Sequence, residues 1–313
     1  MDGILIIDKP EGWTSHDVVA RARRVLREKR IGHTGTLDPF ATGVLVLLVG
    51  RATRLAQFLS GAEKEYEATV RLGYSTDTGD LTGQRRESPS LGEAALDCAA
   101  LTRERLEAAL APLRGNIEQV PPMYSAKKVA GKKLYELARR GEEIEREAAR
   151  VRVSEFEIVA DEDGSLLRPR ADGTCDLRAC VVCSAGTYVR ALAESVGEHL
   201  GTGAHLAALR RTRAGEFGLS RAVSLEEMQK LVEAGEEFLV PLESALPHLP
   251  AAHLTAEAAR RARHGAAVPI DANALEDGCH VRVHDEAGVL LAVGVYDAAA
   301  GLVRPRVTLA SEK

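Results

Sequence analysis

The sequence predicts an α+β fold in which a central mixed or antiparallel sheet is followed by a small β-rich domain. Apolar stretches that suit strands are grouped with helical stretches, without the regular alternation of strand and helix that builds a parallel sheet. Near Pro247 and Pro250 the chain changes character. After this point we expect a short helix at residues 256–263 and three short strands around Val281, Leu290 and Val303. The predicted domains are therefore residues 1–248 and residues 249–313.

The first elements follow from hydrophobic periodicity and turn residues. Residues 3–7 predict a short strand that a Pro/Gly turn ends. Thr14 or Ser15 can cap the next helix, in which apolar residues recur at helical spacing. The apolar run 44–49 predicts a fully buried strand, whereas apolar–polar alternation over residues 66–72 predicts a half-buried one.

Later elements are predicted by the same criteria. One helix and two strands are expected at residues 101–113, 151–159 and 177–182. Gly186 and Thr187 then lead into a helix that carries Tyr188 and Arg190. Before these strands, residues 124–149 form a basic insertion with glycine hinges, which suits a loop that closes on phosphates.

Cysteine content and apolar runs indicate the compartment. The cysteines are odd in number and scattered, which predicts reduced thiols in a cytoplasmic protein rather than a disulfide framework. The N-terminal residues lack the basic start of a signal peptide, and the apolar run 44–49 is far too short to span a bilayer. We therefore expect a soluble cytoplasmic protein with no membrane partner.

Charge alone does not decide whether the chain binds nucleic acid. The formal net charge of −5 counts against it, but an RNA-binding protein needs only a local basic surface. Basic residues gather in four clusters, namely Arg21, Arg23, Arg24, Arg27, Lys29 and Arg30; Lys127, Lys128, Lys132 and Lys133; Arg210, Arg211 and Arg213; and Arg260, Arg261 and Arg263. Each cluster could equally be the solvated face of a helix.

The segment from Gly32 to Gly43 is the most informative for chemistry. Its glycines and a proline fix an irregular backbone that holds His33 and Asp38 at the edge of a predicted buried strand. A carboxylate in such a place can be a nucleophile, a general base or a metal ligand. It can also simply cap the Asp-Pro turn.

A zinc site at Cys180 and Cys183 is not favoured. Tetrahedral zinc generally needs four ligands, and no second pair or histidine cluster follows at suitable spacing. Both residues fall on or beside a predicted buried strand, where small apolar cysteines fit. We therefore predict no metal.

The segment 32–43 resembles the catalytic loop of the TruB-type tRNA pseudouridine synthases, which act on uridine 55 in the T loop. Further blocks similar to family motifs follow the family's order, at residues 9–15, 64–80, 121–127, 184–190 and 209–211. The resemblance covers about the first 240 residues. The C-terminal segment is similar to the small PUA-type RNA-binding domain, although less closely. The resemblance thus implies a pseudouridine synthase-like catalytic domain and a PUA-like domain.

This resemblance also implies residue roles. Asp38 would be the nucleophile, at either C6 of the base or C1′ of the ribose. Arg190 would pair with Asp38 and hold it ionised. Tyr66 would stack on the extruded uracil, a position that a core tyrosine of its strand could also occupy. Tyr188 and Leu209 would line the uridine pocket.

Other implied roles concern the RNA. His33 would fill the gap that the flipped nucleotide leaves in the stack. Phosphate contacts are implied for Lys127, Lys128, Lys132, Lys133, Arg260 and Arg261. The reaction is an isomerisation, so that neither a cofactor nor a metal is expected.

Two other functions compete with a stand-alone enzyme. A non-catalytic RNA-binding protein or RNA chaperone would use the basic clusters but not a buried Asp–Arg pair. The catalytic subunit of a guide-RNA pseudouridylation particle shares the core but generally lacks the insertion between Tyr124 and Ala149. We therefore expect an enzyme that acts on the T arm of tRNA, without guide RNA or an obligatory protein partner.

Overall fold

The computed structural model describes residues 1–86, 96–125, 128–129, 132–138, 140–142, 144–270 and 275–309. These residues form a ten-stranded sheet, a five-stranded sheet and a two-stranded hairpin. The large sheet runs in the order β1 (Gly3–Lys9), β3 (Thr42–Val49), β11 (Ala204–Ala214), β4 (Lys64–Leu72), β10 (Cys175–Cys183), β8 (Ala149–Ile158) and β5 (Gly115–Gln119). Three short strands pair beside this path, namely β2 (Ile31–His33), β9 (Leu167–Pro169) and β12 (Phe217–Gly218).

The sheet is mixed, which confirms the predicted fold class. β11 pairs with β3 in parallel and with β4 antiparallel, and the other pairs of the large sheet are antiparallel. At the parallel contact Gly43 has a φ of 98°, and a Cβ added there would overlap the Arg211 backbone. Only glycine lets the chain at the start of β3 approach β11 this closely.

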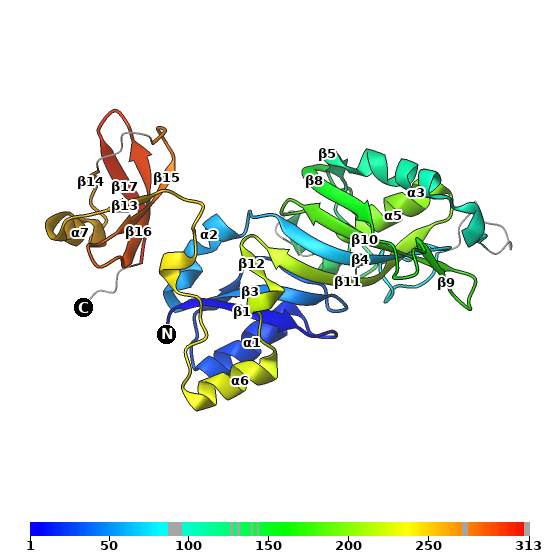
Figure 1. The fold of residues 1–313 in the computed structure, drawn as a ribbon, viewed down its shortest axis with the longest axis horizontal. Coiled ribbons are helices and arrows are strands. Elements are labelled where there is room, and N and C mark those ends of the chain that lie inside the picture. The colour runs from blue at the N-terminus through cyan, green and yellow to red at the C-terminus, as the bar shows by residue number, and fades with distance from the viewer. Residues whose placement is uncertain are drawn as a thin grey trace.

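Four helices cover one face of the large sheet. α1 (Ser15–Leu26) packs beside α6 (Leu225–Ala234) next to β1, whereas α5 (Val189–Leu200) packs on β11 and β4, and α3 (Arg103–Leu110) packs beside α5 and β8 (Figure 1). Thr14 caps α1 through a capping box with Asp17, as the sequence predicts. α2 (Ala56–Leu59) lies toward the C-terminal domain, and α4 (Leu134–Ala138) follows the hairpin of β6 (Lys128–Val129) and β7 (Lys132–Lys133).

The predicted strand types are confirmed. In β3, Leu45 and Leu47 join the core under the helices, whereas Val44, Val46 and Leu48 join a second core on the opposite face. This explains the continuous apolar run at 44–49. β4 alternates between buried and more exposed positions, with Tyr66 on the buried side.

Two expectations from the sequence are wrong in detail. Cys98 and Cys175 form a disulfide, with Cα atoms 6.2 Å apart, so the prediction of reduced thiols fails for this pair. The two cysteines are 77 positions apart in the sequence, and only the fold places the segment before α3 beside the start of β10. Tyr188 precedes α5 as its N-cap residue rather than lying within it.

The C-terminal domain has its own sheet, in the order β13 (Ala251–His253), β15 (His280–His284), β16 (Leu290–Asp297), β17 (Leu302–Thr308) and β14 (Val268–Pro269). α7 (Ala256–Arg263) packs on this sheet, and the predicted helix and three strands are all present.

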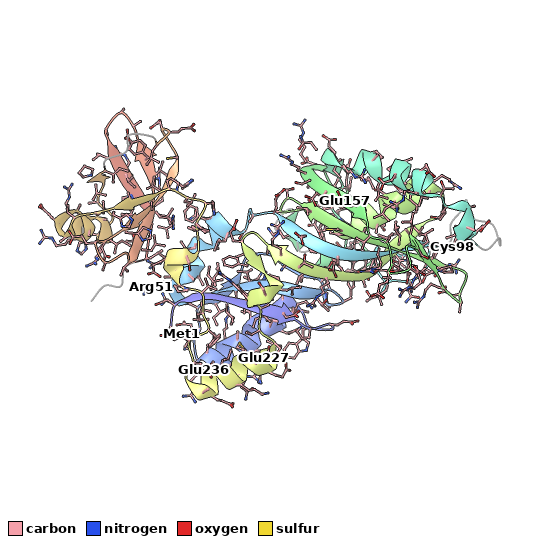
Figure 2. The ribbon with its side chains drawn as sticks, viewed as in Figure 1. Met1, Arg51, Cys98, Glu157, Glu227 and Glu236 are labelled. Atoms are coloured by element: carbon pink, nitrogen blue, oxygen red, sulfur yellow. A yellow bond between two sulfur atoms is a disulfide. The ribbon has the colours of Figure 1, made fainter. Side chains whose placement is uncertain are left out.

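A shared apolar core joins the two domains. Val293, Val307 and Leu309 pack in one cluster with Ile4 and Leu55 of the large domain. Arg51, which Figure 2 labels between the domains, donates to the Leu309 carbonyl oxygen. Among the described residues, every helix is too short or too polar to cross a membrane.

Candidate active site

A pocket of about 300 Å³ opens where the loop at residues 34–38 meets β4, β11 and the start of α5. Its walls include Asp38, Lys64, Tyr66, Tyr188, Arg190, Leu209 and Arg211. These residues come from segments far apart in the sequence, which the strand order β3-β11-β4-β10 brings together. The volume suits a single nucleoside but not a base-paired segment.

Buried polar residues hold the Asp38 loop in place. Ser15 Oγ accepts from the Leu37 amide at 2.8 Å and donates to the Leu37 carbonyl oxygen at 3.1 Å. Lys9 is fully buried, and its Nζ donates to the carbonyl oxygens of Pro10, Trp13 and Pro39. Burial lowers the pKa of Lys9 to about 8, although the nearby Asp38 carboxylate opposes this shift.

Asp38 forms an ion pair with Arg190 inside the pocket. Arg190 Nε lies 2.9 Å from Asp38 Oδ2, and Arg190 Nη2 donates to Oδ1 at 3.3 Å. The helical pattern around Arg190 alone suggests a solvated side chain. In the structure Arg190 is only 4% exposed, because the first turn of α5 lies over the pocket. Its Nη1 and Nη2 also donate to the carbonyl oxygens of Thr78 and Tyr124.

Two effects oppose each other at the Asp38 carboxyl group. Burial raises its pKa above the ordinary value, and the nearby Asp80 carboxylate raises it further. Arg190 lowers it, in the direction expected from the sequence, but does not cancel the effect of burial. The ionised form of Asp38 therefore depends on this guanidinium.

The apolar and aromatic walls are provided by the predicted residues. Tyr66 is 8% exposed, and Leu209 is 7% exposed, so each is part of the core as well as of the pocket. Burial raises the pKa of Tyr66, whereas the adjacent Arg211 guanidinium lowers it. Gln119 fixes Tyr188 by hydrogen bonds to its backbone amide and carbonyl groups.

Among the residues predicted to contact RNA, His33, Arg260 and Arg261 are not part of the pocket lining. His33 ends β2 beside the pocket-lining Thr34, and its Nδ1 is buried without a hydrogen-bond partner in the described part of the chain. Burial lowers the pKa of His33. Arg260 and Arg261 are exposed on α7 of the other domain. Lys128, Lys132 and Lys133 fall on the β6–β7 hairpin, and Lys127 lies outside the described residues.

Three site residues were not assigned a role from the sequence. Asp80, which is 5% exposed, has its Oδ2 3.7 Å from Arg190 Nη1, so that Arg190 lies between two carboxylates. Lys64 and Arg211 also line the pocket. All three fall inside motif blocks of the resemblance, but only the fold shows that Lys64 and Arg211 line the pocket and that Asp80 lies against Arg190.

Comparison with known proteins agrees with this geometry. The model of the TruB family pseudouridylate synthase N-terminal domain matches residues 23–189. Two C-terminal domain models, for tRNA pseudouridylate synthase B and for pseudouridine synthase II TruB, match residues 190–247 and 250–309. The tRNA pseudouridine synthase B of Geobacillus thermodenitrificans is 42% identical over 97% of this chain and 98% of its own length. That of Synechococcus elongatus is 44% identical over 99% of both chains.

Solved structures share the fold at lower identity. A Cbf5–Nop10–Gar1 complex superposes with a TM-score of 0.71 at 28% identity, over 98% of this chain and 85% of that chain. The fold and the pocket together define an enzyme of the pseudouridine synthase class, an isomerase whose C-terminal domain is PUA-like. Because the relatives match along nearly the whole chain, the chain belongs to the TruB family of tRNA pseudouridine synthases.

Proposed function

We propose that this enzyme converts uridine 55 in the T loop of tRNA to pseudouridine, with Asp38 as the nucleophile. The observation that carries this proposal is the Asp38–Arg190 ion pair in a pocket that fits one nucleoside. A target inside a base stack cannot reach such a pocket, so the uridine must be flipped out of the loop. The curated relatives that carry the name tRNA pseudouridine synthase B support tRNA as the substrate.

The chemistry needs only groups that the pocket supplies. Asp38 attacks C6 of the base or C1′ of the ribose, the C1′–N1 bond breaks, and a bond from C5 to C1′ forms. Arg190 keeps Asp38 ionised, Tyr66 stacks on the uracil, and Tyr188 and Leu209 confine it. No electrons are gained or lost overall, so the proposal includes no redox cofactor and no metal.

His33 and the insertion are proposed to hold the remodelled loop. His33 is next to the pocket-lining Thr34 but is not itself part of the lining, and we propose that its ring occupies the place of the flipped nucleotide. The β6–β7 hairpin with Lys128, Lys132 and Lys133, together with Lys127, would contact phosphates next to the target.

The first prediction concerns the position of the modification. Purified protein incubated with unmodified tRNA, and with no other component, is expected to form pseudouridine at position 55 and at no other uridine. Mapping pseudouridine along the tRNA after the reaction provides the measurement. Modification elsewhere would overturn the site assignment, and a requirement for added guide RNA would favour the particle subunit.

Action without guide RNA is part of the proposal. The structural neighbours include a Cbf5 complex and an H/ACA particle bound to substrate RNA, at 28% and 25% identity. The tRNA pseudouridine synthase B relatives are closer, at 42–44% identity, and cover nearly the whole chain. The insertion over residues 124–149, with its hairpin, also favours the stand-alone enzyme.

We also propose that residues 1–248 form the catalytic domain and residues 249–313 an RNA-binding domain that grips the tRNA beyond its T arm. Arg260 and Arg261 lie exposed on α7, where they can contact phosphates. Deleting this domain would strip Val293, Val307 and Leu309 from the core shared with β1 and the segment before α2. Charge removal on α7 therefore tests the proposal better than truncation.

The second prediction is that replacing both Arg260 and Arg261 by alanine weakens binding of full-length tRNA. The slope of log affinity against log salt concentration should become shallower by up to about two, because each phosphate contact contributes about one to this slope. Turnover of an isolated T-arm hairpin should stay unchanged. Arg304→Ala is the matched control, since Arg304 is exposed but already paired with Asp297. Equal losses on both substrates would show that α7 supports folding instead of binding RNA.

A further inference from the structure

Two buried cations, Arg211 and Lys64, lie in the pocket and have no role in the chemistry described above. Arg211 is 1% exposed, and Lys64 is 6% exposed. Both side chains reach the underside of the catalytic loop, because Arg211 Nη1 and Lys64 Cε each lie 3.6 Å from the place where a Cβ on Gly35 would sit. The glycine leaves room for both beneath the loop.

Neither cation is neutralised by an anion. Arg211 donates to the carbonyl oxygens of Val44 and Gly35, and Lys64 donates to those of Ser60 and Ala62. No carboxylate pairs with either side chain within the part of the chain that the structure describes. Cys183 is the nearby acidic group, but burial raises its pKa to about 11, so that the thiol stays neutral. Two like charges buried together are costly unless a ligand uses them.

The rest of the pocket has the opposite charge. Arg190 stands between Asp38, which lines the pocket, and the buried Asp80, so that this group of three side chains holds one cation and two carboxylates. The other charged residues of the pocket lining are Lys64 and Arg211, and the Tyr66 hydroxyl lies beside Arg211. The pocket is therefore negative on the Asp38 side and positive on the Arg211 side.

This polarity matches the charges that develop during isomerisation. When the C1′–N1 bond breaks, its electron pair stays with the uracil, which becomes an anion with charge shared among N1, O2 and O4. C1′ becomes electron-poor at the same time. After the ring turns, C5 bonds to C1′, the C5 proton leaves to a base, and N1 takes up a proton. Groups placed in advance at such charges lower the barrier most.

We propose that Arg211 and Lys64 stabilise the negative charge on the uracil while it is detached from the ribose. Asp38 faces the electron-poor sugar, and the two cations face the electron-rich base. This inference rests on the proposal that the pocket holds the target uridine, which Asp38→Asn tests separately. A phosphate of the RNA is the other anion that the pair could meet, and the test distinguishes the two.

The test is the single-turnover rate of pseudouridine formation in a T-arm hairpin at saturating enzyme, measured as a function of pH. Burial and the nearby Arg211 guanidinium together lower the pKa of Lys64 to about 8, so the wild-type rate should fall as pH rises through about 8. Below that pH, Lys64→Met should lower the rate by at least about tenfold. The rate of this variant should also no longer decrease as the pH rises through about 8. Lys64→Arg should keep most of the rate and move the fall to higher pH, because a guanidinium stays charged.

Matched variants separate charge from structure. Arg211→Lys should retain more of the rate than Arg211→Met. Arg210→Met is the control on the same strand, because Arg210 is outside the pocket and pairs with Asp8. Thermal unfolding of each variant shows whether it is folded.

Three outcomes would overturn the inference. The first is a decrease in rate near pH 8 that persists in Lys64→Met. The decrease would then be assigned to Lys9, because the pKa of Lys9 is also about 8. The second is a loss of rate that is equal at every pH and is not restored by Lys64→Arg. The third is weaker hairpin binding with an unchanged rate, as a phosphate contact would give. All three are distinct from failure of the proposed function, since wild-type activity and the effect of Asp38→Asn are unaffected.

Discussion

Asp38→Asn is expected to abolish pseudouridine formation while tRNA affinity stays within a few-fold of wild type. The substitution keeps the side-chain volume but removes the negative charge and the nucleophilic oxygen. Asp38 is the carboxylate that lines the pocket, and its partner Arg190 is held independently by the carbonyl oxygens of Thr78 and Tyr124. The pocket should therefore keep its shape.

The measurement is single-turnover product formation on a T-arm hairpin, together with tRNA binding by the same variant. We expect the rate to fall at least about 10⁴-fold, since loss of a covalent nucleophile removes a whole route of reaction. Asp8→Asn is a matched control, because Asp8 is also paired with an arginine, Arg210, but lies outside the pocket. Substantial turnover in Asp38→Asn would show that another group is the nucleophile.

Local patterns predict many of the strands and helices, because those elements depend on nearby residues, but they did not predict β5, the central strand β11 or α6. The alternation in β4 and the apolar run in β3 each report which faces are buried, and the structure confirms both. The capping box at Thr14 is likewise a local feature. Tyr188 was placed one position too far into α5, which is the usual uncertainty at a helix end.

The site itself could not be predicted from local patterns, because it is assembled across long sequence distances. Asp38 and Arg190 are 152 positions apart, and nothing near Arg190 shows that its helix begins over a pocket. The resemblance to a family supplied this pair, but not Asp80, whose position against Arg190 depends on the turn after β4. The Cys98–Cys175 disulfide was missed for the same reason.

Sequence patterns predict which residues are buried but not how burial shifts the pKa values of charged groups. The packing that buries β3 and β4 also keeps Lys9, Lys64 and Arg211 away from water. Burial accordingly lowers the pKa of Lys9 and Lys64 to about 8 and raises that of Asp38. Shifted values of this kind gather at functional sites, so the same packing that stabilises the fold also prepares the pocket for charged intermediates.

Arg190→Met is expected to lower activity most strongly at acidic pH, with partial recovery as the pH rises. Asp38 must be ionised to act, and burial already raises its pKa. Arg190 opposes that shift, so removing the guanidinium raises the Asp38 pKa further. A larger fraction of Asp38 is then protonated at low pH. The acidic limb of the pH–rate profile therefore moves to higher pH. Recovery should be incomplete, because the variant also loses the bonds to Thr78 and Tyr124.

Two further variants distinguish the charge of Arg190 from its geometry. Arg190→Lys keeps the charge but cannot reach Asp38, Thr78 and Tyr124 at once, so it should restore the acidic limb without restoring the full rate. Arg71→Met removes an arginine that pairs with Asp176 at 2.7 Å outside the pocket, and its profile should run parallel to that of wild type. The measurement is the single-turnover rate on a T-arm hairpin across the acidic range at saturating enzyme. If Arg190→Met also gives a profile parallel to wild type, Arg190 does not control the ionisation of Asp38, and the ion pair serves only to position the loop.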